Sequence, residues 1–77
     1  MNTFRISELG RRFGLSRSTL LYYDRIGLLR PTGRSRVGYR VYTETDFARL
    51  ERLCFFREAG LSLAEVGLLL DSHKKSS

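Results

Sequence analysis

Apolar side chains recur every three or four positions in four stretches of the chain, which is the spacing of one face of an α-helix. In the first two stretches the residues with this spacing are Ile6, Leu9, Phe13, Leu20 and Tyr23. Gly14 separates the two stretches, and glycine accepts the positive φ with which many helices end. The pattern therefore predicts two short helices within residues about 6–26, joined by a tight turn as in a helix-turn-helix.

The last two stretches predict a second pair of helices. Their apolar faces consist of Phe47, Leu50, Leu53 and Cys54, and then of Leu63, Val66, Leu69 and Leu70. Thr43 and Ser62 precede these faces as N-caps, and Glu65 lies three residues after Ser62, which is the spacing of a capping box. We therefore expect helices over residues about 44–59 and 62–70.

Turn residues and an alternating pattern lie between the two helix pairs. The turn residues are Pro31, Gly33 and Gly38, and residues 39–42 alternate as a strand does. This predicts a two-stranded hairpin, or wing, over residues about 29–42. The fold class that follows is mainly α, a winged helix-turn-helix with a second helix pair. One domain is expected over residues 1–70, followed by a disordered polar tail over 71–77.

Two positions in the first helix carry expectations of their own. Ser7 is a candidate N-cap, because its hydroxyl could accept a hydrogen bond from an amide of the first turn. Gly10 lies within the helix, where glycine costs about 1 kcal/mol relative to alanine. Close approach by the second helix would explain the glycine.

Positive charge is concentrated in the front half of the chain. The whole chain has a net charge of +6. Residues 1–42 hold nine arginines against two acids, a net charge of +7, and residues 43–77 hold five basic residues against six acids, a net charge of −1. A basic surface of this kind favours a polyanionic partner, most often nucleic acid. The alternative is a charge that serves only solubility, but solubility does not require the charge to be segregated.

Composition argues against several other classes of protein. A chain of 77 residues forms one domain with a small core. It contains no paired acids, no nucleophile beside a base and no glycine-rich phosphate loop, so we expect no enzyme and no cofactor. The single Cys54 builds neither a disulfide nor a thiolate metal site alone, and it is expected in the core. The chain contains no apolar run of about 18 residues, so no membrane span is expected.

The adjacent residues Phe55 and Phe56 cannot both face the same core as Leu50 and Leu53, because neighbours on a helix point in different directions. One of them is expected at the surface, where it would pack against a dimer partner or a region beyond this sequence. The alternative is a broad core that wraps the whole helix.

Several short motifs follow one another in a specific order: Ile6-Ser7-Glu8-Leu9, Gly14-Leu15-Ser16, Tyr22-Tyr23-Asp24-Arg25-Ile26-Gly27-Leu28-Leu29, Gly38-Tyr39-Arg40-Val41-Tyr42 and Gly60-Leu61-Ser62-Leu63-Ala64-Glu65-Val66. Together they resemble the N-terminal DNA-binding domain of the MerR family of bacterial transcription regulators. The resemblance covers residues 4 to about 70. The family commonly has arginine at the positions of Ser18 and Leu21, so the chain departs from the family pattern there.

The resemblance implies a cytoplasmic, nucleoid-associated regulator that binds double-stranded promoter DNA as a homodimer. Family members bend and untwist that DNA, which realigns the promoter for RNA polymerase. Dimerisation usually runs through a long C-terminal helix that this sequence lacks, so the chain is either an excised domain or an unusually short protein. Two alternatives stay open: a small excisionase-like protein that bends DNA, and a basic module that binds an acidic protein.

The resemblance also implies a set of DNA-binding residues: Arg17, Ser18, Thr19, Tyr22, Tyr23, Arg36, Tyr39, Arg40 and Tyr42. Residues 17–19 would meet base edges or phosphates in the major groove. Tyr22 would donate its hydroxyl to a phosphate, and Arg36 and Arg40 would pair with phosphates beside it.

Each of these roles has a simpler alternative. Residues 17–19 would otherwise be an ordinary polar first turn, and the two wing arginines would be solvated loop charges. Tyr23 could equally be a core residue. Tyr39 and Tyr42 could support the hairpin against the helices without touching DNA.

Overall fold

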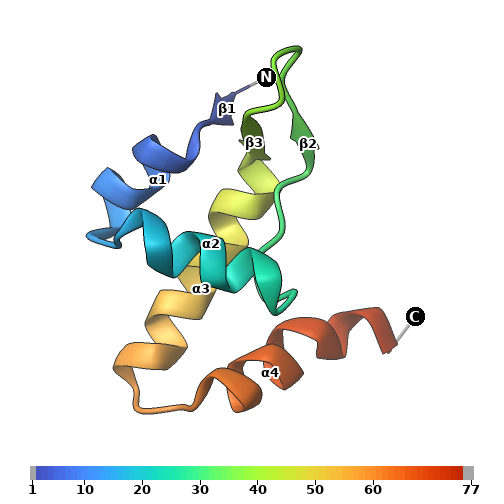
Figure 1. The fold of residues 1–77 in the computed structure, drawn as a ribbon. Coiled ribbons are helices and arrows are strands. Elements are labelled where there is room, and N and C mark those ends of the chain that lie inside the picture. Colours follow the sequence, from blue (N-terminus) through green and yellow to red (C-terminus); the bar gives the residue numbers. More distant parts are fainter. Residues whose placement is uncertain (1, 76–77) are drawn as a thin grey trace.

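The computed structural model describes residues 2–75, which form four helices and three short strands (Figure 1). In chain order these are β1 (Thr3–Phe4), α1 (Ile6–Phe13), α2 (Arg17–Arg25), β2 (Gly33–Arg34), β3 (Arg40–Thr43), α3 (Glu44–Glu58) and α4 (Leu63–Lys75). Helices α1 and α2 form the helix-turn-helix, β2 and β3 form the wing, and α3 and α4 form the second pair. The predicted fold class is therefore confirmed. No helix in the described residues has the length and apolar character needed to cross a membrane.

Side-chain caps begin three of the helices, and the predicted caps Thr43 and Ser62 are confirmed. The backbone N–H of Thr19 donates to Ser16 Oγ (3.1 Å) at the start of α2. At the start of α3, the Thr43 N–H donates to Asp46 Oδ2 (2.9 Å) and the Asp46 N–H donates to Thr43 Oγ1 (3.4 Å). At the start of α4, the Ser62 N–H donates to Glu65 Oε1 (2.8 Å) and the Glu65 N–H donates to Ser62 Oγ (3.1 Å). These reciprocal bonds satisfy amides that have no partner within the helix.

The predicted cap of α1 was wrong. The N-cap is Arg5, two residues before Ser7, and the helix begins at Ile6. The cap is made from inside the helix, because the Glu8 carboxylate accepts the Arg5 N–H (2.8 Å). At the other end of α1, Gly14 has a φ of 66°, as the turn to α2 requires.

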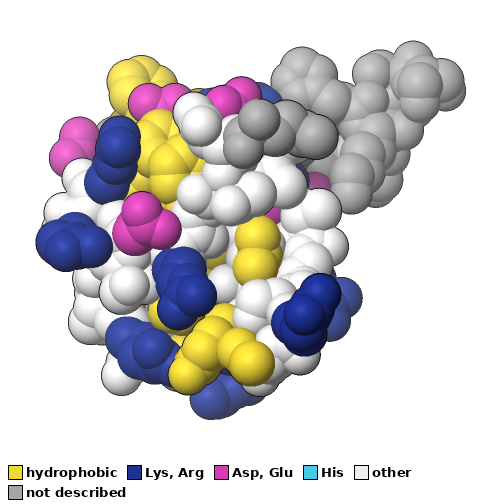
Figure 2. All heavy atoms as spheres, turned by 90° about the horizontal axis from the view of Figure 1, so that it is seen from above, with side chains coloured by type: hydrophobic (Ala, Val, Ile, Leu, Met, Phe, Trp, Pro, Cys, Tyr) yellow, Lys and Arg dark blue, Asp and Glu magenta, His cyan; other side chains and the backbone are white. Residues whose placement is uncertain are grey.

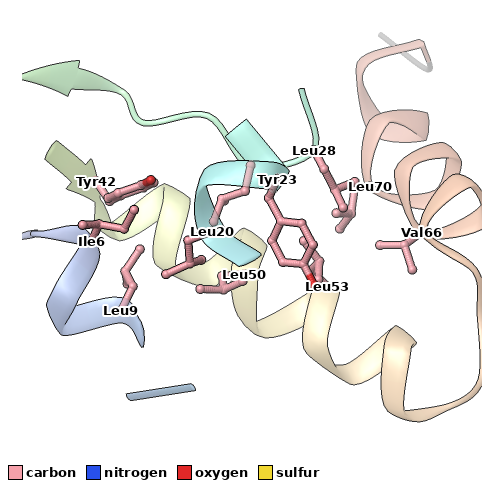
Figure 3. Close-up of a cluster of buried hydrophobic side chains, with 11 residues drawn as sticks. Ile6, Leu9, Leu20, Tyr23, Leu28, Tyr42, Leu50, Leu53, Val66 and Leu70 are labelled. Atoms are coloured by element: carbon pink, nitrogen blue, oxygen red, sulfur yellow. The ribbon is translucent and has the colours of Figure 1, made fainter. Parts of the chain in front are cut away.

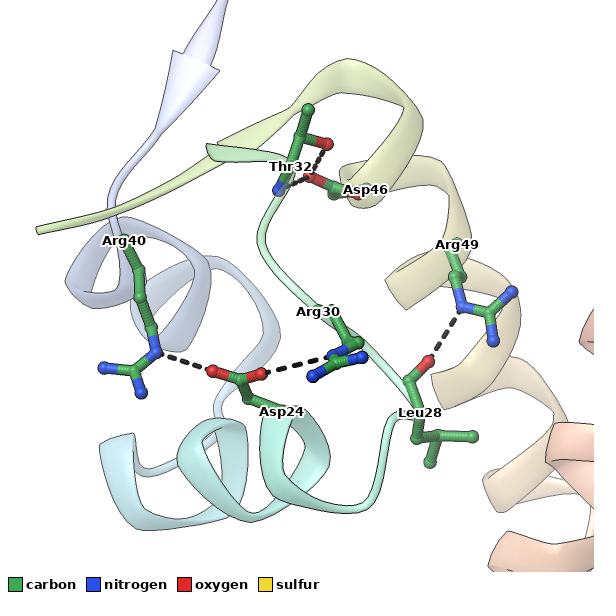
Figure 4. A network of polar contacts seen from close by, with 7 residues as sticks. All are labelled: Asp24, Leu28, Arg30, Thr32, Arg40, Asp46 and Arg49. Atoms are coloured by element: carbon green, nitrogen blue, oxygen red, sulfur yellow. Dashed lines mark hydrogen bonds and ion pairs between the residues drawn. The ribbon is translucent and has the colours of Figure 1, made fainter. Parts of the chain in front are cut away.

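Helix α4 continues to Lys75, beyond the predicted end at residue 70. Arg49 of α3 donates through Nε to the Leu28 carbonyl (2.8 Å) and through Nη2 to Asp71 Oδ1 (3.0 Å), which fixes the added turn (the bond to Leu28 is drawn in Figure 4). Residues 71–75, which we had assigned to the polar tail, are therefore helical. Residues 76–77 lie outside the described part of the chain.

The wing belongs to a three-stranded antiparallel sheet with the order β1-β3-β2. Strand β2 pairs with β3 through Gly33 opposite Val41, which is the expected hairpin. Strand β1 pairs with the other edge of β3, with Phe4 opposite Tyr42. This third strand was not predicted, because two residues are too few to produce an alternating pattern. It ties the chain before α1 to the base of the wing.

The core joins α3 to the helix-turn-helix on one side and to α4 on the other (Figure 3). Its fully buried side chains are Tyr42, Leu9, Leu20, Leu29, Leu50, Leu53 and Val66. Each buried leucine or valine contributes about 1.5–3 kcal/mol through removal from water. Because Leu20 of α2 packs beside Leu50 of α3 (Figure 3), α3 fixes where α2 lies and which face it presents to solvent.

The tight turn between α1 and α2 explains Gly10. A β-carbon at this position would lie 2.7 Å from the carbonyl oxygen of Leu15 and 3.8 Å from Leu20 Cδ1. The backbone of the turn is therefore the closest neighbour of Gly10. We expected the second helix to be that neighbour. The turn is held there, since the Leu15 N–H donates to the Gly10 carbonyl (2.9 Å).

Candidate nucleic-acid interface

The first turn of α2 presents two free polar side chains to solvent. Arg17 and Ser18 are exposed. Thr19 is half-buried, and its hydroxyl lies 2.9 Å from Ser16 Oγ in the cap. The unpaired amides and the dipole of a helix start favour an anion at this place. Arg17 and Ser18 are therefore available for a ligand, whereas Thr19 mainly supports the cap.

A surface hollow joins the starts of α1 and α2 to the tip of the wing. Its lining residues are Arg5, Ile6, Ser7, Arg17, Gly38, Tyr39 and Arg40. The guanidinium of Arg5 lies over the ring of Tyr39, 5.1 Å from its centre, in a cation–π contact. Arginines from three separate segments thus surround one hollow. Arg5 is absent from the predicted set of DNA-binding residues. The sequence signal that could have identified it is its position just before the first helix.

A second hollow adjoins the first, because Arg40 lines both. The other residues around it are Leu21, Asp24, Arg25 and Arg30. We call the arginines that line the two hollows the basic face; they are Arg5, Arg17, Arg25, Arg30 and Arg40. In the space-filling view, basic side chains gather over the lower part of the molecule around hydrophobic ones (Figure 2).

An ion pair ties the wing to α2 within the basic face. Arg40 Nε donates to Asp24 Oδ2 at 2.8 Å, and Arg30 Nε lies 3.9 Å from Asp24 Oδ1 (Figure 4). The side chains of Asp24 and Arg40 are 15% and 27% exposed, so solvent screens this pair only in part. In the sequence, Asp24 is only one of the two acids among the arginines of residues 1–42. Its pairing with a residue 16 positions away was missed.

The tip of the wing is held by its own backbone and side chains. The Ser35 N–H donates to the Tyr39 carbonyl (2.8 Å), and Arg34 Nη1 donates to the Gly38 carbonyl (3.2 Å). Arg36 is exposed at this tip. Val37 beside it is 74% exposed, and no local pattern had predicted an exposed apolar side chain at this position. The tip therefore offers one charged and one apolar side chain.

The four tyrosines divide into two exposed and two buried. Tyr22 is 44% exposed and Tyr39 is 55% exposed, whereas Tyr23 and Tyr42 are 7% and 0% exposed. Burial raises the pKa of both the Tyr23 and the Tyr42 hydroxyl. The proposed DNA contacts of Tyr23 and Tyr42 are corrected here, because side chains enclosed by the core cannot reach a ligand outside it. Both serve the simpler role of packing.

Cys54 packs against the core as expected. Burial raises the pKa of its thiol, and the nearby Glu58 carboxylate adds to the effect. The thiol is therefore protonated at neutral pH and a poor metal ligand. No group of three or more His, Cys, Asp or Glu residues that could hold a metal ion occurs in the described residues.

Exposed apolar side chains lie on α3 and α4, outside the basic face. Phe56 packs against the core, while Phe55 is 67% exposed. This confirms that one of the two faces the surface. On α4, Leu68 is 70% exposed and Leu69 is 42% exposed.

Comparison with known families and proteins gives consistent matches over almost the whole chain. The model of the family described as "MerR HTH family regulatory protein" matches residues 4–73. The HTH-type transcriptional activator TipA of Streptomyces coelicolor is 41% identical over 69 residues, which are 90% of this chain and 27% of TipA. An uncharacterized HTH-type transcriptional regulator of Pseudomonas aeruginosa is 46% identical over 65 residues, 84% of this chain and 49% of that protein. The chain thus spans half or less of these relatives.

Solved structures have the same fold. The N-terminal part of the Bacillus subtilis multidrug transporter activator, MtaN, superposes with a TM-score of 0.85 at 37% identity, over 88% of this chain and 64% of that one. HiNmlR, described as a MerR family regulator lacking the sensor domain and bound to promoter DNA, has a TM-score of 0.85 at 28% identity. That match covers 99% of this chain and 58% of HiNmlR.

Proposed function

This chain belongs to the MerR family of helix-turn-helix regulatory proteins, and we propose on that premise that it is the promoter-binding part of a transcription regulator. The observation that carries the proposal is the basic face, where arginines from the N-cap of α1, from α2, from the following loop and from the wing line two adjoining hollows. Duplex DNA presents a dense row of phosphates to such a surface. The proposed activity is binding and not catalysis.

In the proposed complex, the start of α2 enters the major groove and the wing lies along the backbone. Arg17 and Ser18 are exposed at that start and would reach base edges or phosphates. Tyr22, Arg36 and Tyr39 are also exposed, which suits hydrogen bonds and ion pairs with phosphates. HiNmlR, which is bound to promoter DNA, supports this placement by its similar fold.

We further propose that the intact protein binds as a homodimer, bends its site and thereby affects RNA polymerase in the bacterial cytoplasm. Two copies of a helix-turn-helix read two half-sites of a pseudo-palindrome, so a dimer doubles the contacts. The exposed Phe55 and Leu68 would then have an apolar neighbour in the assembled protein.

A titration with duplex DNA from upstream of its own reading frame tests the proposal. The logarithm of the binding constant should fall linearly with the logarithm of salt concentration, by about 0.9 per phosphate neutralised. If each arginine of the basic face neutralises one phosphate, the slope is about −4.5, so a value between about −3 and −5 is expected.

The same titration, together with a footprint on the same DNA, separates the competing functions. A slope shallower than about −1, or equal binding to an acidic peptide of similar charge, would favour a protein-interaction module. A footprint placed away from promoter elements would favour an excisionase-like protein that only bends DNA.

A further inference from the structure

Asp24 is the one acid among the described residues that line the two hollows of the basic face. A carboxylate near bound DNA repels phosphates, so its presence there opposes association. An acid in this position therefore calls for a role that outweighs the repulsion. The contacts of Asp24 indicate what that role is.

The two oxygens of Asp24 face arginines from two different segments. Oδ2 accepts from Nε of Arg40 in the wing at 2.8 Å, and Oδ1 lies 3.9 Å from Nε of Arg30 in the loop after α2 (Figure 4). Because the carboxylate holds Arg40 by Nε, the two terminal Nη nitrogens stay available for a second acceptor. An arginine has five N–H donors in a rigid fork and can bind two anions in this way.

We propose that Asp24 is a positioning residue for DNA binding, which orders Arg40, and to a lesser extent Arg30, before the duplex arrives. The inference rests on the proposed function. Free arginine side chains lose rotamer freedom when they bind, and this loss weakens association. Arg40 has already lost much of that freedom in its ion pair, whereas Arg30 is 75% exposed and held only loosely. One carboxylate shared by two arginines still leaves a net positive charge for the phosphate.

The change Asp24→Asn separates positioning from charge by the sign of its effect. Removal of a negative charge from the basic face should tighten DNA binding if charge alone matters. If Asp24 orders Arg40, the same change should weaken binding roughly three- to ten-fold, which is the usual effect of losing the pre-ordering of one long side chain. The measurement is the dissociation constant for duplex DNA at fixed salt.

Glu51→Gln is the matched control. Glu51 is exposed on α3, outside the basic face, and the change alters the net charge by the same amount. Its DNA affinity should stay equal to, or slightly above, that of the unmodified chain. Tighter binding by Asp24→Asn than by the control would overturn the positioning role.

A double-mutant cycle with Arg40→Ala shows whether Asp24 acts through Arg40. In the Arg40→Ala background, Asp24→Asn should no longer weaken binding. An equal loss in both backgrounds would contradict the proposal, because it would mean that Asp24 only holds the wing in place. Circular dichroism confirms that each variant is folded.

Arg40→Lys provides a second route if Asp24→Asn fails to fold. Lysine keeps the charge but has no separate Nε and Nη atoms with which to hold a carboxylate and a phosphate together. We expect a loss of affinity of roughly three- to ten-fold, as for Asp24→Asn, and full affinity would contradict the proposal.

Failure of the positioning role can be distinguished from failure of the proposed function. If the unmodified chain itself binds DNA without salt dependence, the proposed function fails. If it binds with the expected slope but Asp24→Asn tightens binding, only the positioning role fails.

Discussion

Replacing Gly10 with alanine is expected to lower the free energy of unfolding by about 1–3 kcal/mol, as overpacking typically does. Alanine is the better helix former by about 1 kcal/mol, so helix propensity alone predicts the opposite sign. The added β-carbon would lie 2.7 Å from the Leu15 carbonyl oxygen. That oxygen belongs to the backbone of the turn, so relief of the clash requires α2 to move relative to α1.

Gly67→Ala is the matched control for this substitution. Gly67 lies within α4, and a β-carbon there would meet only Leu28 Cδ1 at 3.5 Å, an ordinary contact with a flexible side chain. This variant should gain up to about 1 kcal/mol from helix propensity. Urea unfolding followed by circular dichroism measures both changes. Stabilisation by both substitutions would contradict the tight turn between α1 and α2.

The second large effect concerns two arginines of the basic face. Arg40→Ala should weaken binding to all duplexes about equally, and the salt slope should become shallower by about 1. Arg17→Ala should cost about 1–3 kcal/mol of binding free energy and should also relax the preference for the specific site. The difference follows from their places, since Arg17 is exposed at the start of α2 and Arg40 belongs to the wing.

Arg52→Ala is the control for the loss of one positive charge. Arg52 is exposed on α3 and does not line the hollows of the basic face. Its substitution should leave the site preference unchanged and the affinity nearly so. Identical behaviour of Arg17→Ala and Arg40→Ala, in both slope and preference, would refute the division of roles between α2 and the wing.

The helices could be predicted from the sequence because their signals are local. The spacing of apolar residues, a hydroxyl at Ser16 or Thr43 and a glycine at Gly14 each act within a few positions. The features that were missed depend on contacts between distant segments. Strand β1 exists because β3 offers it an edge, and α4 is extended by a bond from Arg49 to Asp71.

The candidate site was predictable in part for the same reason. The start of α2 follows from its cap, so the exposure of Arg17 and Ser18 could be expected. The family resemblance implied that the tyrosines contact DNA, but it did not show whether each side chain faces the core or the solvent. Tyr42 is fully buried. The pairing of Asp24 with Arg40 joins a helix to a strand, and no local pattern encodes it.

The most direct test of the central claim is a map of the DNA-contacting surface. Backbone amide resonances of the isotopically labelled chain would be followed by NMR during titration with its upstream duplex at low salt. The largest shifts are expected in residues 16–25 and 33–40 and at the start of α1, with α4 and the exposed Phe55 little changed. Shifts concentrated on the α3–α4 end, with the basic face unaffected, would contradict the account.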